Sequence, residues 1–481
     1  MANVSKHAAI YVAGRLVPAL IMVVSTAIFT RLADPNVLSA YVLATSTALL
    51  GSAALFQWLR LSVLRYAHGE DRPKVIGAAS GIYIFIALVI ISGAAIGTTV
   101  FETSIDHGLI AASVIVLLCQ AAFDFFQELQ RGALRPVEYS ITLCIKALLS
   151  LAFGTAALLV FKSGYALVLA LALALVLSPI GYARGLLKDV AWDSSWAKRI
   201  LAYGWPLSAS LVLFNISVLG DRFIVTYFLG AREAGLYGPI SDLGRQTITT
   251  LLQSVTLASY PLAIRALKDE GISGARRQLA ANAKLLLLIS VPCAMGLAVA
   301  AEDCAFVLLG TEYRDAAATL LPPLALSAFL MSWQMFYFTQ STQLGEKTFG
   351  QFIIMVAAAA ASLTLAYLLI PKHGLSGAGW AALGGQACGL ATSVVVSRFC
   401  FPLPFPWSDA AKAVFAGLFM AACVKVTQRL AGHPSELRTI LTLSVGAISY
   451  ASVVIGLNAG DARTTAMSAA GRLARMINSR R

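Results

Sequence analysis

The chain has 481 residues, of which 58% are apolar and only 12% are charged, and its formal net charge is +13. Soluble domains contain roughly 45–50% apolar and about 25% charged residues, so this chain has too little polar surface for a soluble globule. One bilayer crossing needs about 20 mainly apolar residues, and the apolar residues present suffice for about fourteen crossings. Little of the chain is left over for a large soluble catalytic unit.

Fourteen apolar runs bounded by charged residues, glycine or proline are predicted to cross the bilayer as helices. None of them has the ten-residue alternation of apolar and polar positions that marks a barrel strand. The expected fold class is therefore an all-α polytopic membrane protein. In chain order the runs are residues 8–30, 37–58, 78–98, 109–130, 139–161, 165–186, 201–229, 234–261, 283–301, 319–340, 349–370, 374–399, 411–427 and 437–457.

The distribution of basic residues predicts the orientation, because lysine and arginine near span ends are retained in the cytoplasm. With the amino terminus inside, 24 of the 36 lysines and arginines fall in cytoplasmic segments and seven in external ones. Both termini are therefore expected in the cytoplasm, which requires an even number of spans. The same distribution explains the net charge of +13 by topology and by contact with anionic lipids, so nucleic acid is not an expected partner.

Two similar stretches suggest an internal repeat. TRLADPNVLSAY at 30–41 follows the first span, TYFLGAREAGLY at 226–237 follows the seventh, and their threonines and tyrosines are each 196 residues apart. The spacing predicts two parallel six-helix lobes, residues 1–200 and 201–400, with a substrate cavity between them near mid-membrane. Residues 401–458 would add two transmembrane helices, and residues 459–481 a basic cytoplasmic tail.

The cysteines and histidines do not indicate a metal site or a disulfide framework. The seven cysteines are scattered through apolar spans without a CxxC spacing, and the five histidines lie far apart near span ends. The longest external loop, about 302–318, is too short to fold as a catalytic domain. We therefore expect neither an enzyme nor a bound metal or cofactor.

Three stretches carry a resemblance to a known family: FTRLADPNVLSAY at 29–41, DRFIVTYFLG at 221–230 with Gly235-Leu236-Tyr237, and GLSGAGWA at 374–381. They resemble the polysaccharide transporter (O-antigen flippase) family of the multidrug/oligosaccharidyl-lipid/polysaccharide exporter superfamily. The resemblance implies alternating access by two lobes. It also implies movement of an undecaprenyl-pyrophosphate-linked oligosaccharide repeat across the bacterial inner membrane for O-antigen, capsule or exopolysaccharide synthesis.

Charged residues inside predicted spans are candidates for function, because an ionisable group in hydrocarbon costs several kcal/mol unless it faces water or a partner. These charges do not recur at the 196-residue offset, as charges needed merely to build each lobe would. The candidate cavity cations are Arg15, Lys146, Arg222 and Arg245, and the candidate acids for ion coupling or ion pairing are Asp124, Glu128, Asp221 and Asp242.

Several of these residues have a structural alternative to a functional role. Arg15 lies roughly 10 Å deep at 1.5 Å per residue, so it could bind pyrophosphate through its bidentate guanidinium or snorkel to the headgroups. Lys146 could bind an anionic group or neutralise Asp124 or Glu128. Asp242 and Arg245 are three residues apart and could form an intrahelical bridge. The resemblance places the first, second, seventh and eighth spans around the cavity.

The sequence is compatible with three hypotheses about function. The first is the flippase, whose partners would be the lipid-linked substrate, membrane lipids, a polysaccharide polymerase and chain-length components. The second is a cation-coupled multidrug exporter of the same superfamily, which Asp221 and Asp242 keep open. The third is a non-transporting scaffold for glycan-assembly enzymes. Since the sequence encodes no nucleotide-hydrolysing unit, H⁺ or Na⁺ coupling, the membrane potential or the substrate gradient would drive transport.

The topology can be tested with reporter fusions. Alkaline phosphatase, which folds only outside the cytoplasm, is expected to be active when inserted within residues 302–318 and inactive when fused after residue 463. The physical reason is the cytoplasmic retention of basic segments. Active phosphatase at the carboxyl-terminal position would contradict the predicted orientation.

Overall fold

The computed structural model describes residues 2–67, 69–100, 106–186 and 191–463, and within these ranges all regular secondary structure is helical. The longer helices, in chain order, are α1 (Ala2–Leu32), α2 (Pro35–Leu55), α3 (Gln57–Tyr66), α4 (Arg72–Val100), α5 (His107–Gly132), α6 (Pro136–Phe161), α7 (Gly164–Leu177), α9 (Ser194–Leu229), α10 (Ala231–Val299), α12 (Arg314–Trp333), α14 (Thr348–Cys400), α15 (Trp407–Ala431) and α16 (Glu436–Gly456). The short helices are α8 (Ile180–Leu186), α11 (Ala301–Leu308) and α13 (Thr339–Leu344), and a π-helical segment, Gln334–Phe338, joins α12 to α13.

Two of the helices fold back on themselves and cross twice. Gly271 in α10 and Gly374 in α14 have φ of 69° and 59°, a conformation that glycine adopts without steric cost, and the helix reverses at each. Every arm exceeds the roughly 20 residues that a crossing needs. With these two helices counted twice, the twelve apolar spans of the described residues make fourteen crossings, so the expected fold class is confirmed.

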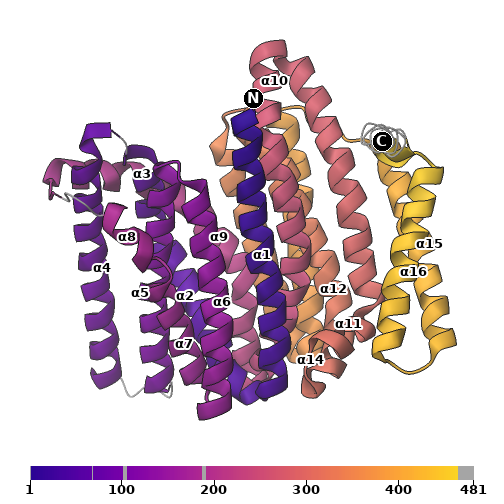
Figure 1. Ribbon diagram of the computed structural model, residues 1–481, viewed down its shortest axis with the longest axis horizontal. Helices are drawn as coiled ribbons and strands as arrows, with labels where there is room; N and C mark the ends of the chain where they lie inside the picture. The colour runs from indigo at the N-terminus through magenta and orange to yellow at the C-terminus, as the bar shows by residue number, and fades with distance from the viewer. Residues whose placement is uncertain (1, 68, 101–105, 187–190, 464–481) are drawn as a thin grey trace, which may run out of the picture.

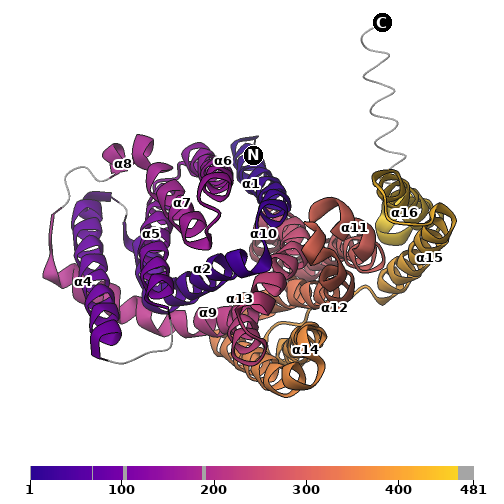
Figure 2. The ribbon, with the colours of Figure 1, turned by 90° about the horizontal axis from the view of Figure 1, so that it is seen from below.

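The two ends of the helix bundle differ in what they carry. Figure 1 shows the start of α1, the reversal of α10 and the end of α16 at one end, which we call the terminal end. The turns α1–α2 and α9–α10 lie at the other, which we call the turn end. Both views show α15 and α16 at one edge of the molecule, beside α10 and α11 (Figures 1 and 2).

A buried ion pair fastens the α15–α16 hairpin to the rest of the protein. Arg438 Nε of α16 lies 2.8 Å from Oδ1 of Asp303 in α11. The other carboxylate oxygen of Asp303 accepts a 2.7 Å hydrogen bond from Gln428 of α15. Asp303 is fully buried and Arg438 is 5% exposed. Since a buried charge is tolerated only with partners, these contacts specify where the hairpin docks.

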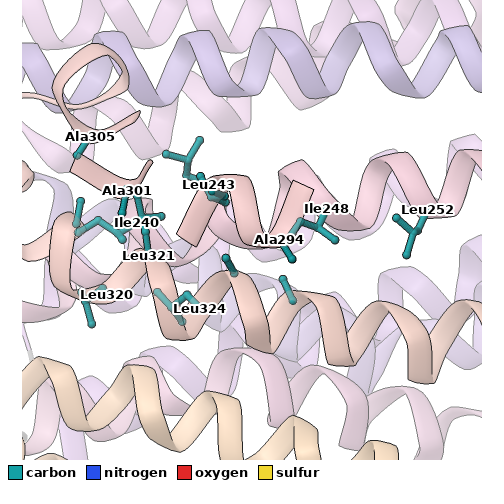
Figure 3. Close-up of a cluster of buried hydrophobic side chains, with 14 of the residues drawn as sticks. Ile240, Leu243, Ile248, Leu252, Ala294, Ala301, Ala305, Leu320, Leu321 and Leu324 are labelled. Atoms are coloured by element: carbon teal, nitrogen blue, oxygen red, sulfur yellow. The ribbon is translucent and has the colours of Figure 1, made fainter. Parts of the chain in front are cut away.

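The buried apolar side chains form two large clusters. One lies within residues 44–200, from α2 to the start of α9. The other lies mainly within residues 225–459 and includes the α10–α11–α12 core drawn in Figure 3. The helix α9 contributes to both, because Ile200 belongs to the first cluster and Val225 to the second.

The turns α1–α2 and α9–α10 contact each other at the turn end. Asp34 caps α2 by accepting a hydrogen bond from the Val37 amide, and Pro35 occupies the first turn of the helix, where its missing N–H costs nothing. A Cβ atom at Gly235 of α10 would lie only 1.9 Å from the carbonyl oxygen of Pro35. The absence of a side chain at Gly235 therefore lets the two backbones touch.

Hydrogen bonds join the same region to the segment after α11. The Gly310 amide donates to Thr30 Oγ1 at 3.1 Å, and Tyr313 donates to the Ala33 carbonyl at 3.3 Å. Arg31 donates to the Val307 carbonyl at 2.6 Å. These contacts link the end of α1 to residues 307–313. The amino-terminal half of the chain, before about residue 200, and the half that follows it are therefore closed against each other at the turn end.

Replacing Gly235 by valine is expected to open the turn end, because the added Cβ cannot fit beside Pro35. A cysteine at Thr45, which faces the space between the halves, should then react at least several-fold faster with a membrane-impermeant maleimide applied from the turn-end side, in a background lacking the native cysteines. Gly93→Val is the matched control, since nothing lies within 4 Å of its Cβ position. Equal labelling of the two variants would contradict this role for Gly235.

Candidate functional site

A cavity of about 510 Å³ lies between the two halves of the chain. Its walls come from α1, α2, α5, α6 and α7 on one side and from α9 and α10 on the other. The side chains that the structure describes along these walls include four cationic ones, Arg15, Lys146, Arg222 and Arg245, and one acidic one, Asp242. The structure thus brings together five of the eight charged residues singled out from the sequence.

Arg15 is placed by the close packing of α1 on α6. A Cβ at the neighbouring Gly14 would lie 2.1 Å from Ser140 Oγ, so only glycine permits this approach. The Arg15 guanidinium donates a 3.3 Å hydrogen bond to the hydroxyl of Tyr139. Arg15 is partly buried and lines the cavity, which favours the cavity role over the snorkelling alternative.

Arg222, Asp242 and Arg245 form a hydrogen-bonded cluster of charges in the cavity wall. One oxygen of Asp242, Oδ1, accepts hydrogen bonds from Arg222 at 2.5 Å and from Arg245 at 2.6 Å. The side chain of Arg222 is 3% exposed, whereas those of Asp242 and Arg245 are 22% and 26% exposed. The intrahelical bridge considered for Asp242 and Arg245 is therefore present, and both residues still face the cavity.

Arg222 also connects the two halves of the chain. Its Nη1 donates to Ser46 of α2 at 3.1 Å, and its Nη2 donates to Ser241 of α10 at 3.2 Å besides Asp242. Because Ser46 and Asp242 lie on opposite halves, any movement of α2 away from α10 must break one of these bonds.

The two faces of α10 explain how its charged residues reach the cavity. The cavity-lining residues recur at the spacing of a single helical stripe: Pro239, Asp242, Arg245, Gln246, Thr250 and Gln253. The opposite stripe is apolar and enters the core of Figure 3. That stripe contains Ile240, Leu243, Ile248 and Leu252. Because the apolar stripe packs into the core, the polar stripe of α10 faces the cavity.

Asp124 and Glu128 have partners other than the one expected. Arg60 of α3 lies 3.0 Å from Asp124 and 3.4 Å from Glu128, and Arg131 lies 2.9 Å from Glu128. Within the described residues no ion pair joins Lys146 directly to either carboxylate. The Lys146 ammonium instead lies 5.1 Å from the centroid of the Phe123 ring, a cation–π contact, and lines the cavity.

Asp221 lies on a different face of α9 from its neighbour Arg222. It accepts a 2.6 Å hydrogen bond from the hydroxyl of Tyr237, while its other oxygen is buried and has no hydrogen-bond partner among the described residues. With Arg245 and Gln386 it lines a second, small cavity of about 40 Å³. Asp221 thus does not line the main cavity, because adjacent residues on a helix point about 100° apart.

Several polar residues of the cavity were not singled out from the sequence. Tyr139, Gln120, Gln246 and Gln253 line it, and Ser46 supports Arg222. The missed signal was the helical spacing of the two glutamines on α10 relative to Asp242. Uncharged hydrogen-bonding groups in spans are less costly and more common than full charges, so they mark a site less clearly in a sequence.

The arrangement is suited to holding an anion beside hydroxyl-rich groups. Arginine presents a planar fork that matches phosphate oxygens, and lysine adds a mobile point charge. Four cations against one acid leave the lining with an excess of positive charge. The amide, hydroxyl and phenol groups around them can donate and accept hydrogen bonds with sugar hydroxyls.

Comparison with known proteins gives one family match. Residues 75–318, about half of the chain, match the family of polysaccharide biosynthesis proteins. A search of curated proteins finds no significant match.

Solved structures match over most of the chain. The inward closed conformation of the lipid II flippase MurJ matches with a TM-score of 0.76 at 12% identity, covering 93% of this chain and 98% of that one. The inward-facing conformation of a MATE family multidrug resistance transporter of the MOP superfamily matches with a TM-score of 0.60 at 16% identity, covering 81% and 97%.

A MOP superfamily transporter from Pyrococcus furiosus, described as having a binding pocket of reverse polarity, matches with a TM-score of 0.53 at 14% identity, covering 82% of this chain and 94% of that one. These likenesses concern the fold, and the resemblance noted in the sequence is confirmed by the family match. The chain belongs to the polysaccharide biosynthesis protein family and has the fold of the MOP superfamily.

Proposed function

We propose that the protein is a flippase for an undecaprenyl-pyrophosphate-linked oligosaccharide repeat in the bacterial inner membrane. It would carry this substrate from the cytoplasmic to the external leaflet for O-antigen, capsule or exopolysaccharide synthesis. The observation that carries the proposal is the cavity in which the described lining places Arg15, Lys146, Arg222 and Arg245 around one carboxylate, Asp242. Membership of the polysaccharide biosynthesis family supports the same class of substrate.

The chemistry of the cavity favours a pyrophosphate headgroup. A pyrophosphate diester carries two negative charges, which would be costly to move through hydrocarbon without compensation. Guanidinium groups replace its hydration shell with charge-assisted hydrogen bonds. A volume of about 510 Å³ falls within the 300–1,000 Å³ range typical of ligand pockets. It accommodates the headgroup and adjoining sugar, while the isoprenoid tail stays in the lipid.

Alternating access would use the two halves of the chain as rocking units. We propose that residues 1–200 and 201–400 form these lobes and that residues 401–458 add a docked hairpin. The closed turn end would be the external gate, with both termini in the cytoplasm. Separation of the turns α1–α2 and α9–α10 would then open the cavity outward, and the Arg222–Ser46 bond would break in that step.

Asp242 does not favour the multidrug-exporter alternative. Cationic drugs call for an excess of negative charge in the cavity, but Asp242, the one carboxylate of the described lining, is already bonded to two arginines. Asp221 faces the small second cavity instead. An H⁺ or Na⁺ gradient remains a proposed energy source. A polysaccharide polymerase and chain-length components remain proposed partners.

Removing the cavity arginines is expected to abolish translocation. Each charge-assisted hydrogen bond contributes about 1.5–3 kcal/mol, so Arg15→Ala alone should slow flipping about ten- to a hundredfold. The triple variant Arg15→Ala, Arg222→Ala and Arg245→Ala should show no flipping above background. The measurement is leaflet translocation of a fluorescently labelled lipid-linked repeat in proteoliposomes.

Arg277→Ala is the matched control. Arg277 forms an ion pair with Glu270, its side chain is 70% exposed, and it does not line the cavity. Its translocation rate should equal that of the unmodified protein. Full activity of a folded triple variant would remove the proposed cationic site, and drug resistance that depends on the gene would favour the exporter alternative.

A further inference from the structure

Asp242 occupies the position of an anion between two arginines. Its Oδ1 accepts from Arg222 Nη2 at 2.5 Å and from Arg245 Nη2 at 2.6 Å. A phosphate oxygen bound between two guanidinium groups would use the same donors. Within the described lining this carboxylate is also the one negative group among four cations.

Burial of Arg222 requires partners for its charge when the cavity is empty. The side chain of Arg222 is 3% exposed and could not remain charged in the wall without a partner. Asp242 supplies that partner, yet its own side chain is 22% exposed and lies on the cavity face of α10. A ligand in the cavity can therefore reach the bonded pair, in contrast with the Asp303–Arg438 pair, whose carboxylate is fully buried.

We propose that Asp242 is a built-in counter-anion that the pyrophosphate of the substrate displaces from Arg222 and Arg245. This inference rests on the proposed function and assigns a specificity-determining role to an acidic residue of the same site. A weak or singly charged anion cannot displace a carboxylate that already holds both guanidinium groups. A pyrophosphate, with two charges and several acceptor oxygens, can bond both arginines at once.

The same competition assists release of the substrate. Four cations without a counter-anion would bind pyrophosphate tightly and hold it, whereas Asp242 can retake the arginines as the substrate leaves. Binding that is equally strong in every state lowers the free energy of the bound form without increasing turnover. Displacement also alters the bonding of Arg222, whose other terminal nitrogen donates to Ser46 on the opposite half. The side chain of Arg222 therefore takes part both in binding the substrate and in the contact between the halves.

Asp242→Asn tests the proposal because it removes the charge and keeps the shape. We expect the affinity for inorganic pyrophosphate, measured by isothermal titration on purified protein in nanodiscs, to increase about tenfold. In proteoliposomes, the concentration of lipid-linked repeat giving half-maximal flipping should fall while the maximal rate also falls. Asp242→Glu, which restores the charge, should return both values toward those of the unmodified protein.

Asp269→Asn is the control for net charge, because Asp269 pairs with exposed Arg265 away from the cavity; its pyrophosphate affinity should be unchanged. Asp242→Ser provides a second uncharged variant, and gel filtration establishes which of the two is folded. Unchanged or weaker pyrophosphate binding by a folded uncharged variant, with normal binding by the unmodified protein, overturns the counter-anion while leaving the flippase proposal intact. Absence of pyrophosphate binding in both proteins overturns both.

Discussion

A guanidinium group in the hydrocarbon layer is stable only beside water or a carboxylate, and Arg222 and Arg245 satisfy this requirement through Asp242. The rest of the site depends on this contact. It requires α9 and α10 to run side by side after the turn at Gly230, and it requires the apolar stripe of α10 to pack into its own half. It also extends to Ser46 of α2, so the bonding of the charges and the contact between the halves are linked.

Two charged networks in the same half-buried setting have different consequences. Arg60 and Arg131 together compensate Asp124 and Glu128, so that cluster has no surplus charge and mainly ties α3 to α5. The cavity cluster, by contrast, contains more cations than acids. Gln120 connects the two, since it lines the cavity and donates to Asp124 at 2.9 Å. The balance of charge, and not the mere presence of charge within a span, distinguishes the part suited to an anionic ligand.

The fold is shared with proteins of 12–16% identity because few positions in it require a particular residue type. A span needs length and apolarity, and lipid accepts any apolar side chain. Stricter requirements apply where backbones touch, as at Gly235 against Pro35 and Gly14 against Ser140. Apart from Gly14, the residues that line the cavity are free of both constraints. The charges of these lining residues are therefore not fixed by the requirements of the fold.

The sequence by itself determined the fold class and the number of crossings, because a hydrocarbon layer about 30 Å thick imposes a length on every apolar run. It also indicated which spans carry charges whose burial needs an explanation. Only the tertiary structure decided the partners. Arg60 lies just beyond the predicted span at 37–58, but the break at Phe56 starts a new helix that carries Arg60 to Asp124, 64 residues away. Such pairings depend on how the packed helices are placed relative to one another. Apolar periodicity in the sequence does not encode this placement, because it shows which face of a helix is buried but not which other helix covers that face.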